Sequence, residues 1–117
     1  MNIKLSNKEK VQDLLNLFCG LLRFRGEDLD YIQFYNCSTI HKRLNVLNIR
    51  AKFSEDKKRT FELNPNEARV FVQLISDCEF YFSGKTFETA FAISICEDLR
   101  KQVEHLKNRQ RMFIASM

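Results

Sequence analysis

Glycine and proline are scarce in this sequence, with 3 and 1 residues among 117, and tryptophan is absent. So little glycine and proline excludes a collagen-like or low-complexity chain, and a hydrophobic content of 44% excludes a wholly disordered one. The length suits a single domain over residues 1–117, which at this size needs neither a disulfide nor a metal ion to fold.

Long apolar runs and paired cysteines are also missing. No run approaches the roughly 18 residues that a membrane span requires, and the polar opening at residues 1–4 is unlike a signal peptide. The four cysteines include no Cys-x-x-Cys pair, so we expect reduced thiols that pack as small hydrophobic side chains. We therefore expect a cytoplasmic protein that does not bind membranes.

Common enzyme and cofactor motifs do not occur. Gly20, Gly26 and Gly84 are too far apart for a phosphate-binding loop, and no serine has the flanking glycines of a nucleophile elbow. Cys37 and His41 could share a helix face and offer zinc two ligands, or act as thiolate and base. Because no tighter spacing signature supports either use, we expect a packed thiol and a surface imidazole, with no catalytic residue, metal or cofactor.

Charge alternates in blocks along the chain, although the net charge is only +4. Residues 1–41 are balanced, and residues 42–59 carry seven basic against two acidic side chains. Residues 60–98 carry two basic against seven acidic, and residues 99–117 carry five against one. Such blocks could form surfaces that steer an encounter with a charged partner, or they could pair with one another inside the fold.

Three segments have the apolar spacing of helices. Residues 7–24 place apolar side chains three and four positions apart, as one face of a helix requires. Asn64 followed by Pro65 predicts the start of a second helix over residues 65–77. The third and longest helix is expected over residues 86–108, apolar on nearly all sides in its first half.

Between these helices the pattern is less decisive. Residues 28–36 fit either a helix or a strand, and both alternatives stay open. Ser38 or Thr39 could cap a short helix that ends near Asn45. Residues 79–82 could form a short strand before the next turn.

Period-two alternation is clearest at residues 47–53 and 59–63, on either side of a polar turn. It predicts a β-hairpin, with a further short strand at residues 3–5. Since an isolated two-stranded ribbon is marginal in water, we expect it to pack against helices. The predicted fold is α+β, a small antiparallel hairpin-based sheet packed against three or four helices, with a long C-terminal helix.

The predicted hairpin would present a cluster of basic side chains. The cluster consists of Arg50, Lys52, Lys57, Lys58 and Arg59. A basic β-ribbon can enter a nucleic-acid groove, and each phosphate that it neutralises releases a counterion. The modest net charge counts against nucleic acid, as does the placement of most phenylalanines in the expected core. An ordinary solvated hairpin with charged edges is the alternative.

The C-terminal helix provides a second candidate surface. Its apolar stripe and the tail that follows comprise Leu99, Val103, Leu106, Met112, Phe113 and Ile114. Because an exposed apolar tail is unfavourable, we expect it to dock within the domain or across a homodimer. On the polar side basic and acidic residues alternate, so we expect ion pairs such as Glu97–Lys101 and a merely solvated surface.

An internal repeat is the alternative to a single undivided unit. At an offset of 59 residues the four cysteines coincide in two pairs, and six further pairs of identical residues coincide as well. A degenerate duplication of residues 1–58 in residues 59–117 would give a pseudo-twofold platform. The number of matches is only modestly above chance.

With no catalytic pattern and two candidate surfaces, the sequence predicts a small non-enzymatic module that binds another macromolecule, in the first place a protein. The alternative is a nucleic-acid-binding regulator that uses the basic segment at residues 48–59. Abundant Phe, Ile, Lys and Asn with little Gly, Ala and Pro is typical of AT-rich coding DNA. That composition is compatible with an accessory protein, or an inhibitor of a host factor, from a phage or mobile element.

Overall fold

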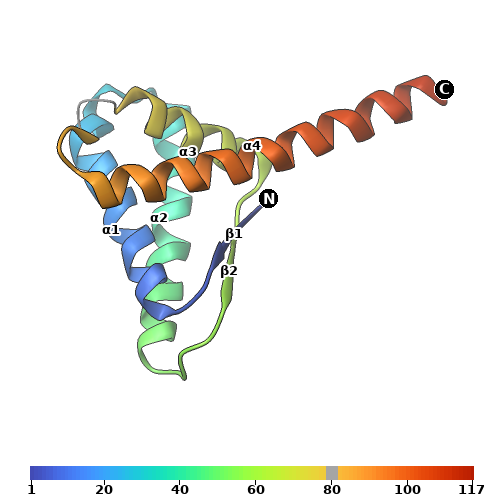
Figure 1. The fold of residues 1–117 in the computed structure, drawn as a ribbon. Helices are drawn as coiled ribbons and strands as arrows, with labels where there is room; N and C mark the ends of the chain where they lie inside the picture. The colour runs from blue at the N-terminus through green and yellow to red at the C-terminus, as the bar shows by residue number, and fades with distance from the viewer. Residues whose placement is uncertain (79–81) are drawn as a thin grey trace.

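Two short strands and four α-helices make up the chain in a computed structural model, which describes residues 1–78 and 82–117. In chain order the elements are β1 (Asn2–Leu5), α1 (Lys8–Arg25), the 3₁₀ turn η1 (Gly26–Asp28), α2 (Tyr31–Lys52), β2 (Arg59–Glu62), α3 (Pro65–Asp77) and α4 (Thr86–Ala115). The strands pair antiparallel, α4 packs against α3 and β1, and its C-terminal part extends away from the other helices (Figure 1). The predicted α+β class with a long C-terminal helix is confirmed.

The helix starts expected near residues 7 and 64 are present. Asn7 caps α1, because its side chain accepts a hydrogen bond from the backbone N–H of Lys10 at 3.0 Å. Asn64 and Glu67 form a capping box at α3, in which each side chain bonds to the backbone N–H of the other. The prediction of a helix over residues 65–77 is confirmed.

A single helix, α2, occupies residues 31–52, so the hairpin predicted from residues 47–53 is wrong. The core-facing residues of α2 are spaced three and four apart: Cys37, Ile40, Leu44, Asn48 and Ala51. Asn48 is buried because its amide donates a hydrogen bond to Gln12 Oε1 at 2.9 Å, whereas Ile49 and Phe53 are exposed. The alternation resembled a strand because polar Asn48 faces the core while apolar Ile49 and Phe53 face the solvent.

The start of α2 resolves the segment that the sequence left open between helix and strand. Asp30 and Gln33 form a capping box, so the helix begins at Tyr31. Ser38 and Thr39 lie inside this helix, and the expected cap of a short helix at these residues is wrong. The strand expected at residues 79–82 falls on residues 79–81, which are outside the described part of the chain.

The strand expected at residues 59–63 is present as β2, but its partner is β1. Ile3 lies opposite Phe61, and the backbone N–H of Leu63 donates to the carbonyl of Met1 at 2.6 Å. The sheet is therefore antiparallel as predicted, yet it joins the N-terminal segment to the middle of the chain and is not a hairpin.

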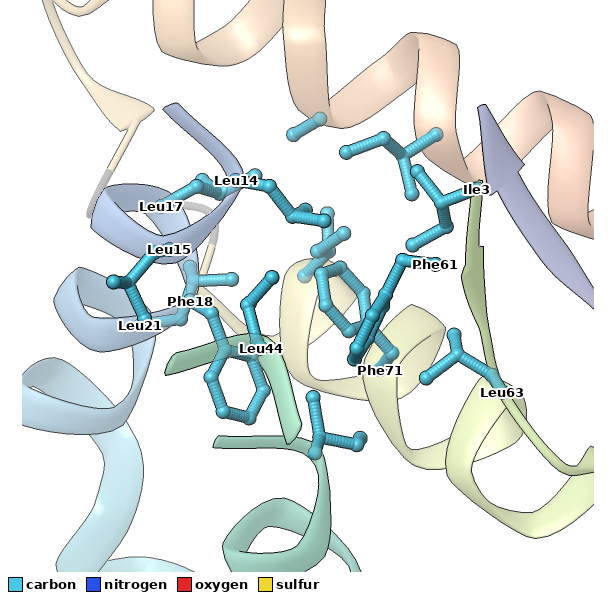
Figure 2. Close-up of a cluster of buried hydrophobic side chains, with 14 of the residues drawn as sticks. Ile3, Leu14, Leu15, Leu17, Phe18, Leu21, Leu44, Phe61, Leu63 and Phe71 are labelled. Carbon is cyan, nitrogen blue, oxygen red and sulfur yellow. The ribbon is translucent and has the colours of Figure 1, made fainter. Parts of the chain in front are cut away.

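The core lies between this sheet and the four described helices (Figure 2). The rings of Phe18 in α1 and Phe71 in α3 stack with their centroids 5.5 Å apart. Figure 2 shows Ile3, Phe61 and Leu63 of the strand segments pointing toward these rings. Because the sheet has only two short strands, most of the buried apolar surface comes from contacts between helices.

The order strand, helix, helix occurs twice along the described residues, as β1-α1-α2 and β2-α3-α4. However, the offset of 59 residues does not superimpose the helix starts. Asn7 caps α1, but its counterpart Asn66 lies inside α3, where Asn64 is the cap. Duplication of one unit stays a prediction.

Glu67 joins α2, β2 and α3 through one buried carboxylate. It accepts a hydrogen bond from the Thr39 hydroxyl at 2.7 Å and forms an ion pair with Arg43, which also donates to the Glu62 carbonyl at 2.6 Å. Burial by itself acts to raise the pKa of Glu67, but the hydrogen bonds from Asn64, Thr39 and Arg43 and the charge of Arg43 outweigh it, so that the pKa is lowered.

We expect Glu67→Gln to lower the free energy of unfolding at neutral pH by about 1–3 kcal/mol, because it leaves the half-exposed Arg43 without its anion. A lowered folded-state pKa stabilises the protein above the ordinary value of 4.5, and this contribution is lost as pH falls through the folded-state pKa. Urea unfolding from about pH 3 to pH 7 should therefore show a shallower acid loss in the variant than in the wild type. Equal acid losses in both proteins would contradict the assignment.

Candidate binding surface

Helix α4 buries only one side of its first half, where Phe87 and Ile93 remain exposed, so the helix is not covered nearly all round as its apolar sequence suggested. The core-facing residues of the first half are Ala92, Ile95, Cys96 and Leu99. Every residue from 104 to 117 is exposed, and the helix continues to Ala115, past the predicted end at residue 108. At 1.5 Å per residue, residues 104–115 extend roughly 18 Å from the other helices, as Figure 1 shows. We call residues 104–117 the α4 extension.

The extension starts from a fixed base at Gln102. Its Oε1 accepts a hydrogen bond from the backbone N–H of Asn2 at 2.7 Å, and its Nε2 donates to the carbonyl of Asn2 at 2.8 Å. The side-chain amide thus occupies the edge of β1 that faces away from β2, as the backbone of another strand would. The direction in which the extension leaves the domain is set by this paired contact.

One apolar stripe continues from the core onto the extension. Its members are spaced alternately four and three apart, interrupted only by Gln110, and are Leu99, Val103, Leu106 and Phe113. We call these residues the α4 stripe. The exposed fraction rises along it from 0% at Leu99 to 40% at Leu106 and 68% at Phe113. The same spacing therefore buries one end of the stripe and leaves the other end without cover.

The structure brings most of the predicted C-terminal contact residues onto one side of α4. Leu99, Val103, Leu106 and Phe113 belong to the stripe, and Ile114 lies beside it at 100° per residue. Met112 points to the opposite side of the helix by the same geometry. Docking of the tail within its own domain is not observed among the described residues, because Met112, Phe113 and Ile114 are all exposed. The homodimer stays a prediction.

A groove of about 810 Å³ lies between α3 and α4 at the base of the extension. Its apolar lining comes from Pro65, Ala68, Val72, Val103 and Leu106. Arg69, Arg100 and Lys107 line its charged side together with Glu104, and Gln110 lies at the end toward the extension. The groove and the exposed part of the α4 stripe therefore form one continuous surface.

Positive charge surrounds this surface. The basic side chains next to the stripe and groove, which we call the basic rim, are Arg69, Arg100, Lys107 and Arg109. Within residues 1–78 and 82–117, none of the four lies within ion-pair distance of a carboxylate, and the expected Glu97–Lys101 pair is not formed. No acidic residue follows Glu104 in the helix. The expectation that ion pairs neutralise this side of α4 is therefore wrong.

The basic residues predicted on a hairpin lie instead in α2 and the loop after it. Arg50 and Lys52 are in the last turn of α2, where two positions correspond to about 200° of rotation, so they point to different sides. Lys57 and Lys58 are exposed in the loop, and Arg59 begins β2. The common basic strand face that the sequence predicted is not present.

The loop does form a basic end of the molecule. The guanidinium of Arg59 donates to the Ser54 hydroxyl and to the carbonyls of Glu55 and Lys57, and so fixes the loop. Asp56 accepts a hydrogen bond from the backbone N–H of Lys8 at 2.8 Å, which places the start of α1 against the loop. Lys4 also lines a shallow groove of about 380 Å³ with Lys58 and Arg59.

An exposed apolar cluster at the start of α2 was missed by the sequence analysis. It consists of Tyr31, Ile32, Phe34 and Tyr35, and Tyr31 is 83% exposed. In the sequence this cluster is visible as four large apolar residues within positions 31–35. The core face of α2 is already supplied from Cys37 onward, so these side chains remain at the surface.

Cys37 and His41 lie four residues apart in α2, and Cys37 is buried in the core whereas His41 is exposed. Among the described residues no group of three or more His, Cys, Asp or Glu side chains is arranged to hold a metal ion. Burial raises the pKa of Cys37 and of Cys78 to about 11, and it raises the pKa of Cys96 as well. The prediction that these three cysteines pack as small hydrophobic side chains is confirmed.

Cys19 is only half-buried, and we expect it to react first with iodoacetamide in the folded protein at neutral pH. Cys37, Cys78 and Cys96 should react only in denaturant, because burial restricts access to them and disfavours their thiolates. Timed alkylation followed by mass spectrometry measures this order, with Cys19→Ser as the control. Uniform alkylation of all cysteines without denaturant would contradict the packing described above.

The chain matches no family model, and no curated protein or solved structure matches it. Its surfaces are therefore interpreted from their own geometry and charge. Within residues 1–78 and 82–117, no helix combines the length and the apolar character needed to cross a membrane.

Proposed function

We propose that this chain is a small binding module without catalytic activity, and that it recognises a partner protein through the α4 extension. The observation that carries the proposal is the continuation of the α4 stripe from the core into water, where Leu106 and Phe113 are uncovered. Exposed apolar surface costs roughly 25 cal/mol per Å² relative to a covered one. Contiguous apolar surface with a charged border is typical of a protein interface.

The base of the extension supports the same proposal. The hydrogen bonds of Gln102 to Asn2 hold α4 in a fixed direction, so a partner meets a surface that is already ordered. Pre-ordering lowers the entropic cost of association. The groove between α3 and α4 adds a concave site into which an anchoring side chain of the partner can insert.

A homodimer through α4 is less favourable than a different partner. Residues 105–117 carry three charged side chains, and all of them are basic: Lys107, Arg109 and Arg111. Two copies of this helix in parallel would bring the like charges of residues 105–117 together, with Glu104 as the nearest acidic side chain in the helix.

A reducing cytoplasm is the compartment that we propose, because four free cysteines, three of them buried, suit such a compartment. The amino-acid composition is typical of AT-rich coding DNA, and it supports an accessory or inhibitory role for a phage or mobile element. In that role the partner would be a host protein, bound by the α4 extension.

Site-specific photo-crosslinking in cells that naturally contain the protein tests the proposal. With benzoylphenylalanine in place of Gln110, on the exposed stripe, we expect one dominant protein adduct; with the same group in place of Lys58, at the basic end, we expect none. Introducing Leu106→Asp and Phe113→Asp should abolish the adduct while lowering the free energy of unfolding by only about 1–2 kcal/mol, because both side chains are exposed and the main cost is the lower helix propensity of aspartate.

Phe53→Asp is the matched control, since Phe53 is also an exposed aromatic residue but follows the C-terminal end of α2 and is not part of α4. It should leave the adduct intact. An adduct that survives the change of Leu106 and Phe113, or one that forms only at position 58, would contradict the proposal.

Nucleic-acid binding is the second candidate, and the placement of Lys4 and Lys8 beside the basic loop favours it. In this case Lys57→Glu with Lys58→Glu should weaken binding to duplex DNA at least about tenfold and reduce its salt dependence. Fluorescence anisotropy at several salt concentrations measures both effects. Binding that is absent, or that these changes leave untouched, would eliminate this candidate.

A further inference from the structure

The α4 stripe has the spacing of a helix-pairing seam. Toward the start of the helix the same spacing leads from Leu99 to Cys96 and Ala92, and all three residues are buried. Beyond Leu106 the spacing continues in residues that are exposed to solvent. A seam that repeats every 3.5 residues is covered most completely by another helix that runs along it. The domain covers the first half of this seam, and the second half lacks a neighbour of that shape.

Both flanks of the open seam are basic. At 100° per residue, Lys107 lies on one side of the line from Leu106 to Phe113 and Arg109 lies on the other. Arg69 and Arg100 extend the positive charge along the groove at the base, where Glu104 is the one acidic residue in the lining. Because these four side chains have no ion pair in the described part of the chain, acidic residues of a docked helix could meet them on both sides.

The shape of the surface disfavours a lipid bilayer and nucleic acid. The apolar stripe is narrow and contains Gln110 at its centre, whereas a helix that lies on a membrane presents a broad apolar face. The groove behind Leu106 is concave and lined by Val72, so it can receive a single side chain but not a flat bilayer. Nucleic acid would meet the basic rim and leave the apolar seam uncovered.

We infer that the occupant of this surface is an amphipathic helix of another protein that carries glutamate or aspartate on both sides of an apolar edge. It lies along the α4 stripe, and a side chain at one end of it enters the groove between α3 and α4. The inference rests on the proposed function and names the chemical class of the partner. Its apolar edge covers Leu106 and Phe113, and its carboxylates meet Lys107 and Arg109.

Designed peptides test this inference with the full chain. The probe is a fluorescent helical peptide of about 21 residues with leucine and isoleucine at the seam positions and glutamate at the flanking ones. The matched peptide has lysine at the flanking positions. By anisotropy, we expect the glutamate peptide to bind saturably and at least about tenfold more tightly than the lysine peptide, with a preference that shrinks as salt is added.

Charge reversal then locates the binding site. Lys107→Glu with Arg109→Glu should weaken the glutamate peptide at least about tenfold and strengthen the lysine peptide. The same reversal at Lys57 and Lys58 is the control, and it should change neither affinity. All four side chains are exposed, and circular dichroism verifies that each variant keeps its helices.

Three results would overturn the inference. The first is equal affinity for the two peptides, or no binding of either. The second is dimerisation of the full chain in sedimentation that Leu106→Asp and Phe113→Asp abolish, which assigns the seam to a second copy. The third is binding to phosphatidylserine vesicles that the same variants abolish, which assigns it to a membrane. If crosslinking at position 110 succeeds and both peptides fail, the proposed function stands and the acidic helix is wrong.

Discussion

The carboxylate of Glu67 accepts hydrogen bonds from the backbone N–H of Asn64, from the Thr39 hydroxyl and from the Arg43 guanidinium, and it is nearly excluded from water. Through it, α2, the end of β2 and the start of α3 are fixed relative to one another in a domain whose sheet has only two short strands. Such a sheet cannot organise four helices by itself. The position of α3 therefore depends on this buried charge, and so does the groove that α3 forms with α4.

The second constraint is the edge of β1. Its outward-facing backbone groups at Asn2 would be an open edge, and Gln102 occupies them with a side-chain amide. The domain buries apolar residues of α4 as far as Leu99 and holds the helix at Gln102, and nothing described here covers the turns that follow. The contact at Gln102 sets the direction in which the helix leaves the domain, whereas the turns beyond it have no packing contacts until a partner covers them.

The local signals in the sequence predicted those elements that local interactions specify. Asn64 and Pro65 fix the start of α3, and the regular stripe of residues 7–24 gives α1, because capping and one-sided burial need no information from distant segments. The hairpin failed for a tertiary reason, since Asn48 becomes an inside residue only when Gln12 of α1 satisfies its amide. For the candidate site, the sequence contained the stripe, but one spacing produces both its buried and its exposed halves, so the point where cover ends depends on the packed fold.

Two of the uncovered apolar surfaces on the described part of the molecule differ in the charge that lies beside them. The cluster at the start of α2 follows Glu27, Asp28 and Asp30, whereas the α4 stripe is bordered by the basic rim. Apolar complementarity alone would let one amphipathic partner bind at either place. Under the proposal, an acidic partner would be repelled from the first surface and attracted to the second, so the charges beside each surface would discriminate between two similar apolar surfaces. Charge would then determine where the partner binds, and the stripe would determine how long it stays.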